Sequence, residues 1–416
     1  MIMKRSLMAQ MRHEWRSNIW IIIELFLVFG VIWFIMLVNI DTFRTLMQPK
    51  GFDDKDVYTL AINYISPESP EYVDMGEAAE ENNFRDQKQL IDRIRANANV
   101  EAAAFSNNAL PYNFSYWGNS FFVVGKNDSI QYNGNWRMAS PDVVRVLRLE
   151  SKTGKSRAEL ERMLRNGEIL LARDGYYEAN GRNTYDLIGR MVSNDSVTTY
   201  KVGDVVESIK RSSYETNSGG MMLIPIDESL QNGSRYMNMI VRVRPGMGLK
   251  FAEDFNSDIS LRQQRNVVLS SLSSLETTRD IAQRAEASGL RARIGVMLLF
   301  LAIVFLGLLG SFWYRVQQRN AEIAMRKVCG AGRRQIFTRL MSEGSLLLLC
   351  GAVLTVLLAV GLIWHFGKDY VGGDLAFVAW CGLATLAIME FMILFGVFFP
   401  ACHAMKIEPA IALKDE

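Results

Sequence analysis

Four long apolar segments constrain this chain more than any other feature of its sequence. They lie at residues 19–38, 294–314, 345–366 and 375–399. Each provides the roughly 20 residues with which a helix crosses the hydrocarbon core of a bilayer. The length of 416 residues and the formal net charge of +2 indicate only that the chain has more than one domain. The apolar segments, in contrast, predict an integral membrane protein with four transmembrane helices.

The first apolar segment follows a basic leader, MIMKRSLMAQMRHEWR, and has two interpretations, a cleaved signal peptide or a membrane anchor. A signal peptide has an apolar stretch of roughly 7 to 15 residues and then a cleavage site of small residues. This segment is longer, and LVNIDTF after it contains no such site. We therefore expect an amphipathic cytoplasmic N-terminus over residues 1–18 and a first transmembrane helix over 19–40.

Lysine and arginine residues beside the spans predict the orientation of the chain, because such residues accumulate on the cytoplasmic side. They cluster before the first span and between the second and third spans, at Lys4, Arg5, Arg12, Arg16, Arg315, Arg319, Arg326, Lys327, Arg333, Arg334 and Arg339. Arg291 and Arg293 oppose this rule before the second span, but the loop outweighs them. Both termini, including a tail over 400–416, are therefore expected in the cytoplasm, and residues 41–293 outside it.

The large insertion between the first two spans has a mixed pattern. DVYTLAINYI alternates like a strand, FRDQKQLIDRIRANA has apolar residues at helical spacing, and VEAAAFS indicates another strand. Further strands are expected at NSFFVVG, GEILLARD, GGMMLIPI and MNMIVRVR, a short helix at SPDVVRVLRL, and turns at Asn133-Gly134 and Asn232-Gly233. We predict an extracytoplasmic α+β domain over 41–260. It would fold without disulfides, because all four cysteines lie outside it.

The last part of the insertion, residues 261–293, has no proline and a single glycine. Val268, Leu272, Leu275 and Ala282 follow one another at steps of four, three and seven, which suits a helix that packs on a partner. We predict a helical stalk here. Joined to the second span, it would project on the order of 45 Å at 1.5 Å per residue.

The loop between the second and third spans, residues 315–344, has the chemistry of a rigid charged element at a membrane surface. Arg319, Glu322 and Arg326 stand at i, i+3 and i+7, so Glu322 can pair with either arginine on one helix face. Gly330-Ala331-Gly332 is expected to break the helix, because glycine adopts the left-handed cap conformation without a Cβ penalty.

Two interpretations of this loop remain open. A second helix that begins with Arg333 and Arg334 could simply hold anionic headgroups at the membrane surface. Alternatively, the loop is a docking element for a partner, with Ile323 and Val328 as apolar knobs beside the charged face.

The loop also carries a resemblance to a known family. RNAEIAMRKVCGAGRRQIFTRLMSEGSLLLLCG resembles the signature of MacB/FtsX-type ABC transporter permeases, R-x-x-E-I-x-x-R-K/R-x-x-G-A, a basic pair, then a Glu entering the third span. The tail PACHAMKIEPAIALKDE is similar to the family ending. MASPDVVRVLRLE and GEILLARDGYYEANGRNTYDLIGRMV resemble segments of the MacB periplasmic domain. Cys402-His403 in place of a basic pair and Cys329 in place of a leucine depart from the pattern without changing its spacing.

The resemblance implies a permease subunit in a bacterial inner membrane, with one span, a large periplasmic domain and then three spans at 294–314, 345–366 and 375–399. Such a subunit works with a second permease copy, identical or related, and with a separate cytoplasmic ABC ATPase dimer. ATP and Mg would be held by the ATPase, so this chain would be neither an enzyme nor the holder of a cofactor. Membrane lipid and a periplasmic protein are further partners to expect, and nucleic acid is not.

In that family the cytoplasmic loop docks on the ATPase, so the resemblance implies coupling residues within 315–344. They are Arg319, Glu322, Ile323, Arg326, Lys327, Gly330, Ala331, Arg333 and Arg334. ATP-driven change would pass to the outer domain, for export or for mechanotransmission. The alternative is a transmembrane sensor or regulator whose outer domain binds a ligand or activates a cell-wall hydrolase.

Two carboxylates inside the spans, Glu24 and Glu390, could mark a proton path, because a charge in lipid is costly. We expect instead that Glu24 reaches headgroup water and that Glu390 is protonated or hydrogen-bonded between helices. No enzyme motif such as HExxH or GxSxG occurs. SKTGKS (151–156) lacks the first glycine of a phosphate loop, since Leu149 stands there, and is expected to be a polar turn.

Overall fold

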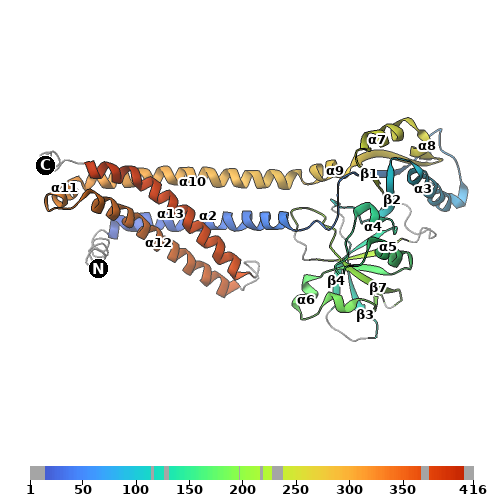
Figure 1. Ribbon diagram of the computed structural model, residues 1–416, viewed down its shortest axis with the longest axis horizontal. Coiled ribbons are helices and arrows are strands. Elements are labelled where there is room, and N and C mark those ends of the chain that lie inside the picture. The colour runs from blue at the N-terminus through green and yellow to red at the C-terminus, as the bar shows by residue number, and fades with distance from the viewer. Residues whose placement is uncertain are drawn as a thin grey trace. The chain divides into compact units, whose positions relative to one another are not determined.

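The structure is a computed structural model that describes residues 15–113, 117–125, 131–195, 197–215, 219–226, 238–366 and 374–406. The chain divides into two compact units (Figure 1). Met1–Phe43 and Ser288–Glu416 form the helical unit, and Arg44–Ala287 forms the α+β unit. An α+β domain is thus inserted after the first of four long helices, which confirms the predicted fold class.

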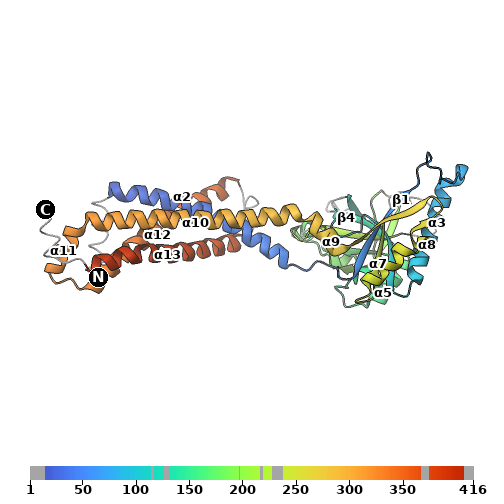
Figure 2. The same cartoon turned by 90° about the horizontal axis from the view of Figure 1, so that it is seen from above.

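Within the residues that the structure describes, the helical unit has four long helices and a short one, α11. They are α2 (Trp15–Met47), α10 (Arg284–Gln318), α11 (Asn320–Val328), α12 (Arg333–Phe366) and α13 (Leu375–Lys406). The four long helices are long and apolar enough to cross a membrane, as the sequence predicts. Seen in Figures 1 and 2, α11 lies at the end of the helical unit where α13 finishes.

Small residues let these helices pack closely. At Gly351 of α12, a Cβ atom would lie 3.0 Å from the backbone nitrogen of Phe26 on α2. At Gly344, a Cβ atom would lie 2.8 Å from the side chain of Ile393 on α13. Glycine at these positions therefore brings α12 into van der Waals contact with both neighbours, which is how helices associate where lipid removes the hydrophobic driving force.

The described part of the α+β unit contains eleven strands and several helices. The strands are β1 (Val57–Tyr64), β2 (Val100–Asn107), β3 (Gly118–Val123), β4 (Tyr132–Ala139), β5 (Ile169–Ala172), β6 (Met191–Ser193), β7 (Thr199–Val206), β8 (Gly220–Pro225), β9 (Asn238–Val243), β10 (Gln263–Gln264) and β11 (Val267–Ser274). The helices are η1 (Gly76–Ala78), α3 (Ala79–Ala96), α4 (Val143–Leu147), α5 (Arg157–Arg165), α6 (Gly175–Ala179), η2 (Thr184–Leu187), α7 (Gly248–Ser257), α8 (Ile259–Arg262) and α9 (Leu275–Ala282).

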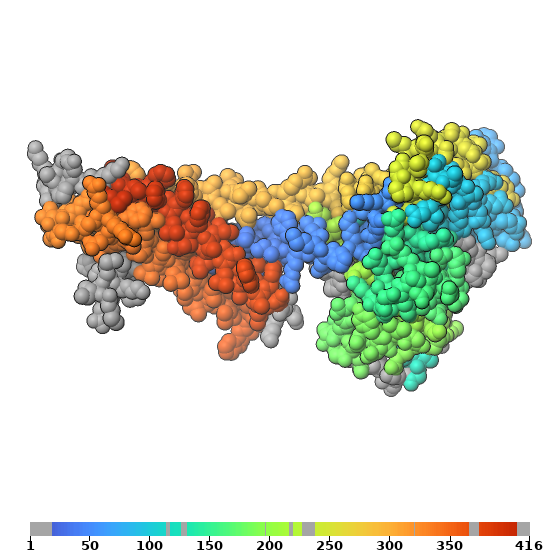
Figure 3. Space-filling view, viewed as in Figure 1, coloured from blue at the N-terminus to red at the C-terminus, as the bar shows by residue number. Residues whose placement is uncertain are grey.

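The strands form two lobes. In the sheet lobe, β10, β11, β1, β9 and β2 pair antiparallel in that order. In the barrel lobe, the order β4, β3, β6, β7, β5 and β8 closes on itself, because β8 pairs in parallel with β4. A short antiparallel pairing of β2 with β4 joins the lobes. Figure 3 shows the sheet lobe mainly in light blue and yellow and the barrel lobe mainly in green.

Both faces of the sheet lobe are buried. Successive residues of a strand point to opposite faces, and on β9 Met239 and Val241 join the core beneath α3 and α7, whereas Ile240 joins the core beneath α4, α5 and α9. The same alternation occurs on β2, where Ala104 and Phe105 point to opposite cores. The sheet lobe is therefore the middle layer of a three-layer arrangement, with apolar side chains of β9 and β2 in the core on each face.

Several predicted elements are confirmed and two predictions are wrong. The strand, helix and strand predicted at the start of the insertion are β1, α3 and β2, and the four further strands are β3, β5, β8 and β9. Asn133-Gly134 is not a turn but lies inside β4. Gly134 instead packs closely on β8, since a Cβ there would lie 3.1 Å from the backbone carbon of Gly220. Asn232-Gly233 lies outside the described residues.

The second correction concerns the helical stalk. Residues 261–262 end the short helix α8, and residues 263–274 contain the strands β10 and β11. Helix resumes only with α9 and the start of α10. Val268 and Leu272 have helical spacing, yet the antiparallel pairing of β11 with β1, over seven residue pairs, decides their conformation. For a short apolar run, the local spacing of apolar residues alone does not distinguish a helix from a strand.

Candidate coupling site at the α11 turn

A tight turn joins α11 to α12. Gly330 has φ +92°, the left-handed conformation that the sequence predicts for a helix cap. The Gly330 N–H donates to the carbonyl of Lys327 at 3.0 Å, and the Ala331 N–H donates to that of Arg326 at 2.9 Å. These are the two bonds of a Schellman motif, so the last carbonyls of α11 are satisfied and the turn has a defined geometry.

One of the two expected pairings of Glu322 forms. Arg326 donates to the Glu322 carboxylate from Nε at 3.0 Å and also from its terminal nitrogen. Both side chains are more than a third exposed, so this i, i+4 pair stabilises α11 by only about 0.3–0.5 kcal/mol. Arg319 turns away from Glu322 and bonds to a different carboxylate.

That carboxylate is Glu343 of α12, which was not among the predicted site residues. It accepts from Arg319 at 2.9 Å and from Arg315 at 3.4 Å. The three side chains are only 6 %, 16 % and 11 % exposed, respectively. One buried carboxylate therefore joins the end of α10, the start of α11 and α12. The signal in the sequence is the isolated charge in MSEGSLLLL, but its partners are 24 and 28 residues away and no local pattern identifies them.

The apolar residues of α11 divide between core and surface. Ile323 is 6 % exposed and packs in the core of the helical unit with residues of α10, α12 and α13, so it is a structural residue and not an exposed knob. Met325 and Val328 are 58 % and 65 % exposed. With Cys329, Arg333 and Arg334, which are also exposed, they form what we call the α11 face.

Lys327 holds α11 against the end of α13. Its ammonium group donates to the carbonyl of Met405 at 2.8 Å. Burial, and then repulsion from Arg333, lowers the pKa of Lys327 below its ordinary value. The predicted site residues thus have two roles, since Ile323, Lys327 and Arg319 fix α11 to its neighbours while the α11 face is exposed.

A hollow of about 390 Å³ lies beside this face. It is lined by Arg326, Cys329, Gly330, Ala331, Gln335, Ile336 and Arg339. Two arginines on the wall and an apolar floor at Ile336 would suit an acidic side chain on an otherwise apolar element.

The two carboxylates inside the spans have different surroundings. Ser345 of α12 donates a hydrogen bond to Glu390 of α13, as the hydrogen-bonded interpretation of Glu390 expects. Glu24 of α2 is half-buried and lies against Gly307 of α10, where a Cβ would be 3.5 Å from the Glu24 Oε1.

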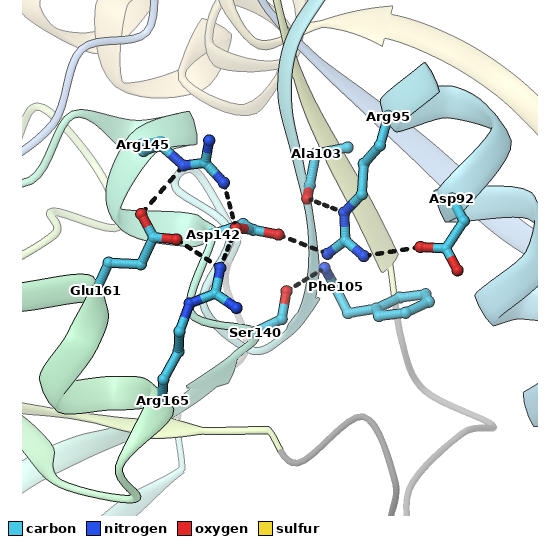
Figure 4. A network of polar contacts seen from close by, with 9 residues as sticks. All are labelled: Asp92, Arg95, Ala103, Phe105, Ser140, Asp142, Arg145, Glu161 and Arg165. Atoms are coloured by element: carbon cyan, nitrogen blue, oxygen red, sulfur yellow. Dashed lines mark hydrogen bonds and ion pairs between the residues drawn. The ribbon is translucent and has the colours of Figure 1, made fainter. Parts of the chain in front are cut away.

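The α+β unit contains a second polar centre, shown in Figure 4. Asp142 lies between Arg95 of α3 at 2.7 Å, Arg145 of α4 at 2.6 Å and Arg165 of α5 at 3.2 Å. Arg145 and Arg165 also bind Glu161, and Arg95 binds Asp92. This network ties the helix on one face of the sheet lobe to the helices on the other. A hollow of about 640 Å³ opens beside it, lined by Arg95, Asp142, Arg165, Tyr200 and several apolar residues.

Comparison with known proteins agrees with this architecture. The macrolide export ATP-binding/permease protein MacB of Bdellovibrio bacteriovorus is 25 % identical over 241 residues, which cover 55 % of this chain and 36 % of the relative. Residues 294–409 match the family model of the FtsX-like permease C-terminal domain. The chain is similar to permeases of the MacB/FtsX type. Its four membrane-length helices accordingly make it a multi-pass membrane protein.

The permease is similar to further proteins over shorter stretches. MacB of Campylobacter jejuni is 29 % identical over 122 residues, which cover 29 % of the permease and 19 % of the relative. The chain therefore spans about a third or less of the length of these curated relatives.

Two solved structures match the permease at low TM-scores. The periplasmic region of MacB from Actinobacillus actinomycetemcomitans aligns with 58 % of the permease and 98 % of that chain, at 12 % identity and a TM-score of 0.33. The extracellular domain of the noncanonic ABC-type transporter YknZ from Gram-positive bacteria aligns with 51 % of the permease and 100 % of that chain, at 10 % identity and a TM-score of 0.31.

Proposed function

We propose that this permease is the membrane subunit of an ABC complex, in which the α11 face docks a separate cytoplasmic ATPase. ATP-driven movement of the ATPase then passes through the helical unit to the α+β unit, for export or for mechanotransmission. ATP and Mg belong to the ATPase in this proposal, and the permease itself performs no catalysis.

The observation that carries the proposal is the combination of an exposed face with a rigid attachment. Met325 and Val328 project from α11, but Ile323, Lys327 and the Glu343 ion pairs bind the same short helix to α10, α12 and α13. A partner that pushed on α11 would therefore move the ends of three long helices together. A simple headgroup anchor has no need of these buried bonds.

The chemistry of the α11 face indicates what it would bind. Arg333 and Arg334 are exposed, and Arg326 and Arg339 line the adjacent hollow. Exposed apolar side chains surrounded by arginines suit a partner groove with an apolar floor and acidic rim, since complementary charge favours encounter and fixes register. Anionic lipid would contact the same arginines.

The remaining parts of the proposal follow the family and the charge distribution. The cluster of lysine and arginine around 315–344 favours a cytoplasmic position for α11 and for both termini, which puts the α+β unit in the periplasm of a bacterial inner membrane. The named relatives are ATP-binding/permease proteins for macrolide export, so an ATPase and a second permease copy, identical or related, are the expected partners. A periplasmic protein is a further candidate partner.

A second candidate function is ligand sensing by the α+β unit, with signalling or activation of a hydrolase in place of transport. The observation that favours it is the 640 Å³ hollow beside Asp142, whose wall combines arginine and tyrosine side chains with apolar residues. Hollows of this volume and mixed lining are typical of small-molecule sites.

Co-purification from native membranes tests the docking role of the α11 face. We would compare the wild type with Val328→Arg and Glu322→Arg, and use Val197→Arg as the matched control, because Val197 is 85 % exposed but belongs to the α+β unit. Partners would be identified by mass spectrometry. An ABC ATPase should accompany the wild type and the control and be lost from both α11 variants.

Two results would overturn this proposal. If no ATPase accompanies the wild type, α11 is a headgroup anchor and ligand sensing becomes the leading function. If an ATPase binds all variants equally, it docks elsewhere on the permease.

A further inference from the structure

The hollow of about 640 Å³ beside Asp142 lies where the two lobes of the α+β unit meet. Arg95 on its wall belongs to α3, which covers the sheet lobe, whereas Tyr200 and Ile224 belong to the barrel-lobe strands β7 and β8. Both lobes therefore contribute to the wall. The volume is within the range of roughly 300–1,000 Å³ that is typical of small-molecule sites.

Part of the wall is apolar. Leu164, Ile224 and Ile226 line the hollow and are between 1 % and 7 % exposed. Gly167, which also lines it, has φ +78°, and a Cβ atom at this glycine would have no heavy atom within 4 Å. The hollow is thus open beside Gly167 and offers buried aliphatic side chains to an apolar group that enters it.

The polar part of the wall depends on Arg165, the last residue of α5. Its Nη2 atom donates to Glu161 at 2.6 Å and to Asp142 at 3.2 Å, and Figure 4 shows both bonds on this one nitrogen. Among the residues that the structure describes, none accepts a hydrogen bond from the Nε or Nη1 atom of Arg165. Because a guanidinium has five N–H groups, three remain for a ligand, on a side chain that two carboxylates already hold in place.

The carboxylate of Asp142, in contrast, is already occupied by arginines. Its Oδ1 atom accepts from Arg145 at 2.6 Å and from Arg165 at 3.2 Å, and its Oδ2 atom accepts from Arg95 at 2.7 Å. Among the lining residues, Asp142 is the one acid and Arg95 and Arg165 are the two bases, which leaves one net positive charge on the wall. A cation would therefore find no unoccupied carboxylate, and a dianion would meet repulsion from Asp142 and from Glu161 behind it.

We infer that this hollow binds a small amphipathic monocarboxylate, a molecule with one carboxylate and an apolar body. The carboxylate accepts from the Nε and Nη1 atoms of Arg165, and hydrogen bonds between ionised partners are about twice as strong as neutral ones. The apolar body covers Leu164, Ile224 and Ile226. Since Arg165 is already held by its two carboxylates, binding immobilises little additional side chain.

This inference rests on the second candidate function, ligand sensing by the α+β unit, and names the class of ligand. It is independent of docking at the α11 face, because every residue that it uses belongs to the α+β unit.

Isothermal titration calorimetry of the permease in lipid nanodiscs tests the site, with empty nanodiscs as the blank. The probe is 4-phenylbutanoate, which has one carboxylate and an apolar body. Two matched compounds separate these features. The first, 4-phenylbutylamine, has the same body and the opposite charge, and the second, acetate, has the carboxylate without the body.

Two variants of the wall are compared with the wild type. Arg165→Gln replaces the guanidinium by a shorter neutral amide, and Thr199→Trp fills the hollow from an exposed residue of its wall. Arg157→Gln is the matched control, because Arg157 is at the other end of α5, has a similarly exposed side chain and pairs with Glu150 at 3.3 Å outside the hollow.

We expect one saturable site for 4-phenylbutanoate and none for the amine or for acetate. The Kd should rise about 10–100-fold in Arg165→Gln, as for the loss of a hydrogen bond between charged groups. Binding should be absent in Thr199→Trp and unchanged in Arg157→Gln.

The inference is overturned if the wild type shows no saturable binding, if the amine binds equally well, or if the Kd is unchanged in either wall variant. A merely structural role of Arg165 would lower the melting temperature of Arg165→Gln and leave its Kd unchanged. Thr199→Trp decides the case if Arg165→Gln does not fold. Failure of this site leaves docking at the α11 face standing, and a failure of ATPase co-purification leaves the site standing.

Discussion

The buried ion pairs that Glu343 forms with Arg315 and Arg319 give the sharpest quantitative expectation for the helical unit. Glu343→Gln removes the negative charge that faces Arg315 and Arg319 where all three side chains are at most 16 % exposed. Breaking a buried pair by removing one partner typically costs about 3–5 kcal/mol, because the other charge stays buried without compensation. Glutamine keeps one acceptor oxygen, so we expect the lower end, about 3 kcal/mol.

The assay is the apparent melting temperature of the detergent-solubilised permease at one fixed heating rate. For a unit of about 150–250 residues, 1 kcal/mol corresponds to about 2–4 °C, so Glu343→Gln should lower the melting temperature by about 6–12 °C. The matched control is Glu322→Gln, which makes the same change in an ion pair that is more than a third exposed. Its loss of about 0.3–0.5 kcal/mol corresponds to about 1–2 °C.

Two results would refute this reasoning. Equal small shifts in both variants would show that burial does not make Glu343 special. A second test replaces Glu343, Arg315 and Arg319 together by leucine. Removing all three charges should recover much of the lost stability, because well-packed apolar side chains commonly stabilise a fold as much as the buried ion pair that they replace. Failure of this rescue would show that the cost arises from packing and not from unpaired charge.

Three further predictions concern the α+β unit. Gly51→Ala should prevent stable folding, because its Cβ would lie 2.0 Å from a backbone oxygen, whereas Gly154→Ala, also left-handed at φ +85° but without a close neighbour, should cost about 1–2 kcal/mol in a melting experiment. Asp142→Asn should lower the free energy of unfolding by about 2–3 kcal/mol, since three arginines bind that carboxylate, and an unchanged melting temperature would contradict this. Burial acts to raise the pKa of Asp54, but the hydrogen bonds from Lys50 and Tyr112 outweigh it and lower the pKa in the folded state. The contribution of Asp54 is therefore fully present above its ordinary pKa of 3.8 and is lost as pH falls through the lower folded value. Acid melting curves should therefore show a smaller loss of stability in Asp54→Asn than in the wild type.

The elements that sequence could predict are those decided by neighbours in the chain. The apolar length of each span, the alternation in DVYTLAINYI and the glycine that ends α11 act over a few residues, and the structure has all three where they were expected. Glu322 and Arg326 are one helical turn apart, so their pair could be predicted as well. Which of Arg319 and Arg326 pairs with Glu322 could not be predicted, because Arg319 bonds instead to Glu343 on α12.

Residues 261–274 show most clearly where local pattern fails. Their apolar side chains fit a helix, but the edge of β1 offers unpaired backbone groups, and pairing with it makes residues 267–274 the strand β11. Ile323 was expected on the surface of α11 but is buried. The spacing of apolar residues shows which of them share a helix face, but not whether that face packs on the core.

The sequence by itself determined the class of this permease, the order of its spans and the inserted domain, because bilayer thickness and helix or strand periodicity act on contiguous residues. Only the tertiary structure decided the buried ion pairs of Glu343, the closure of the barrel through β4 and β8, and the hydrogen bonds of Asp54. The donors to Asp54 come from positions 50, 112 and 279, and those to Glu343 from two different helices. Such contacts form only once distant segments are folded together, and what selects them is the cost of leaving a buried charge without a partner.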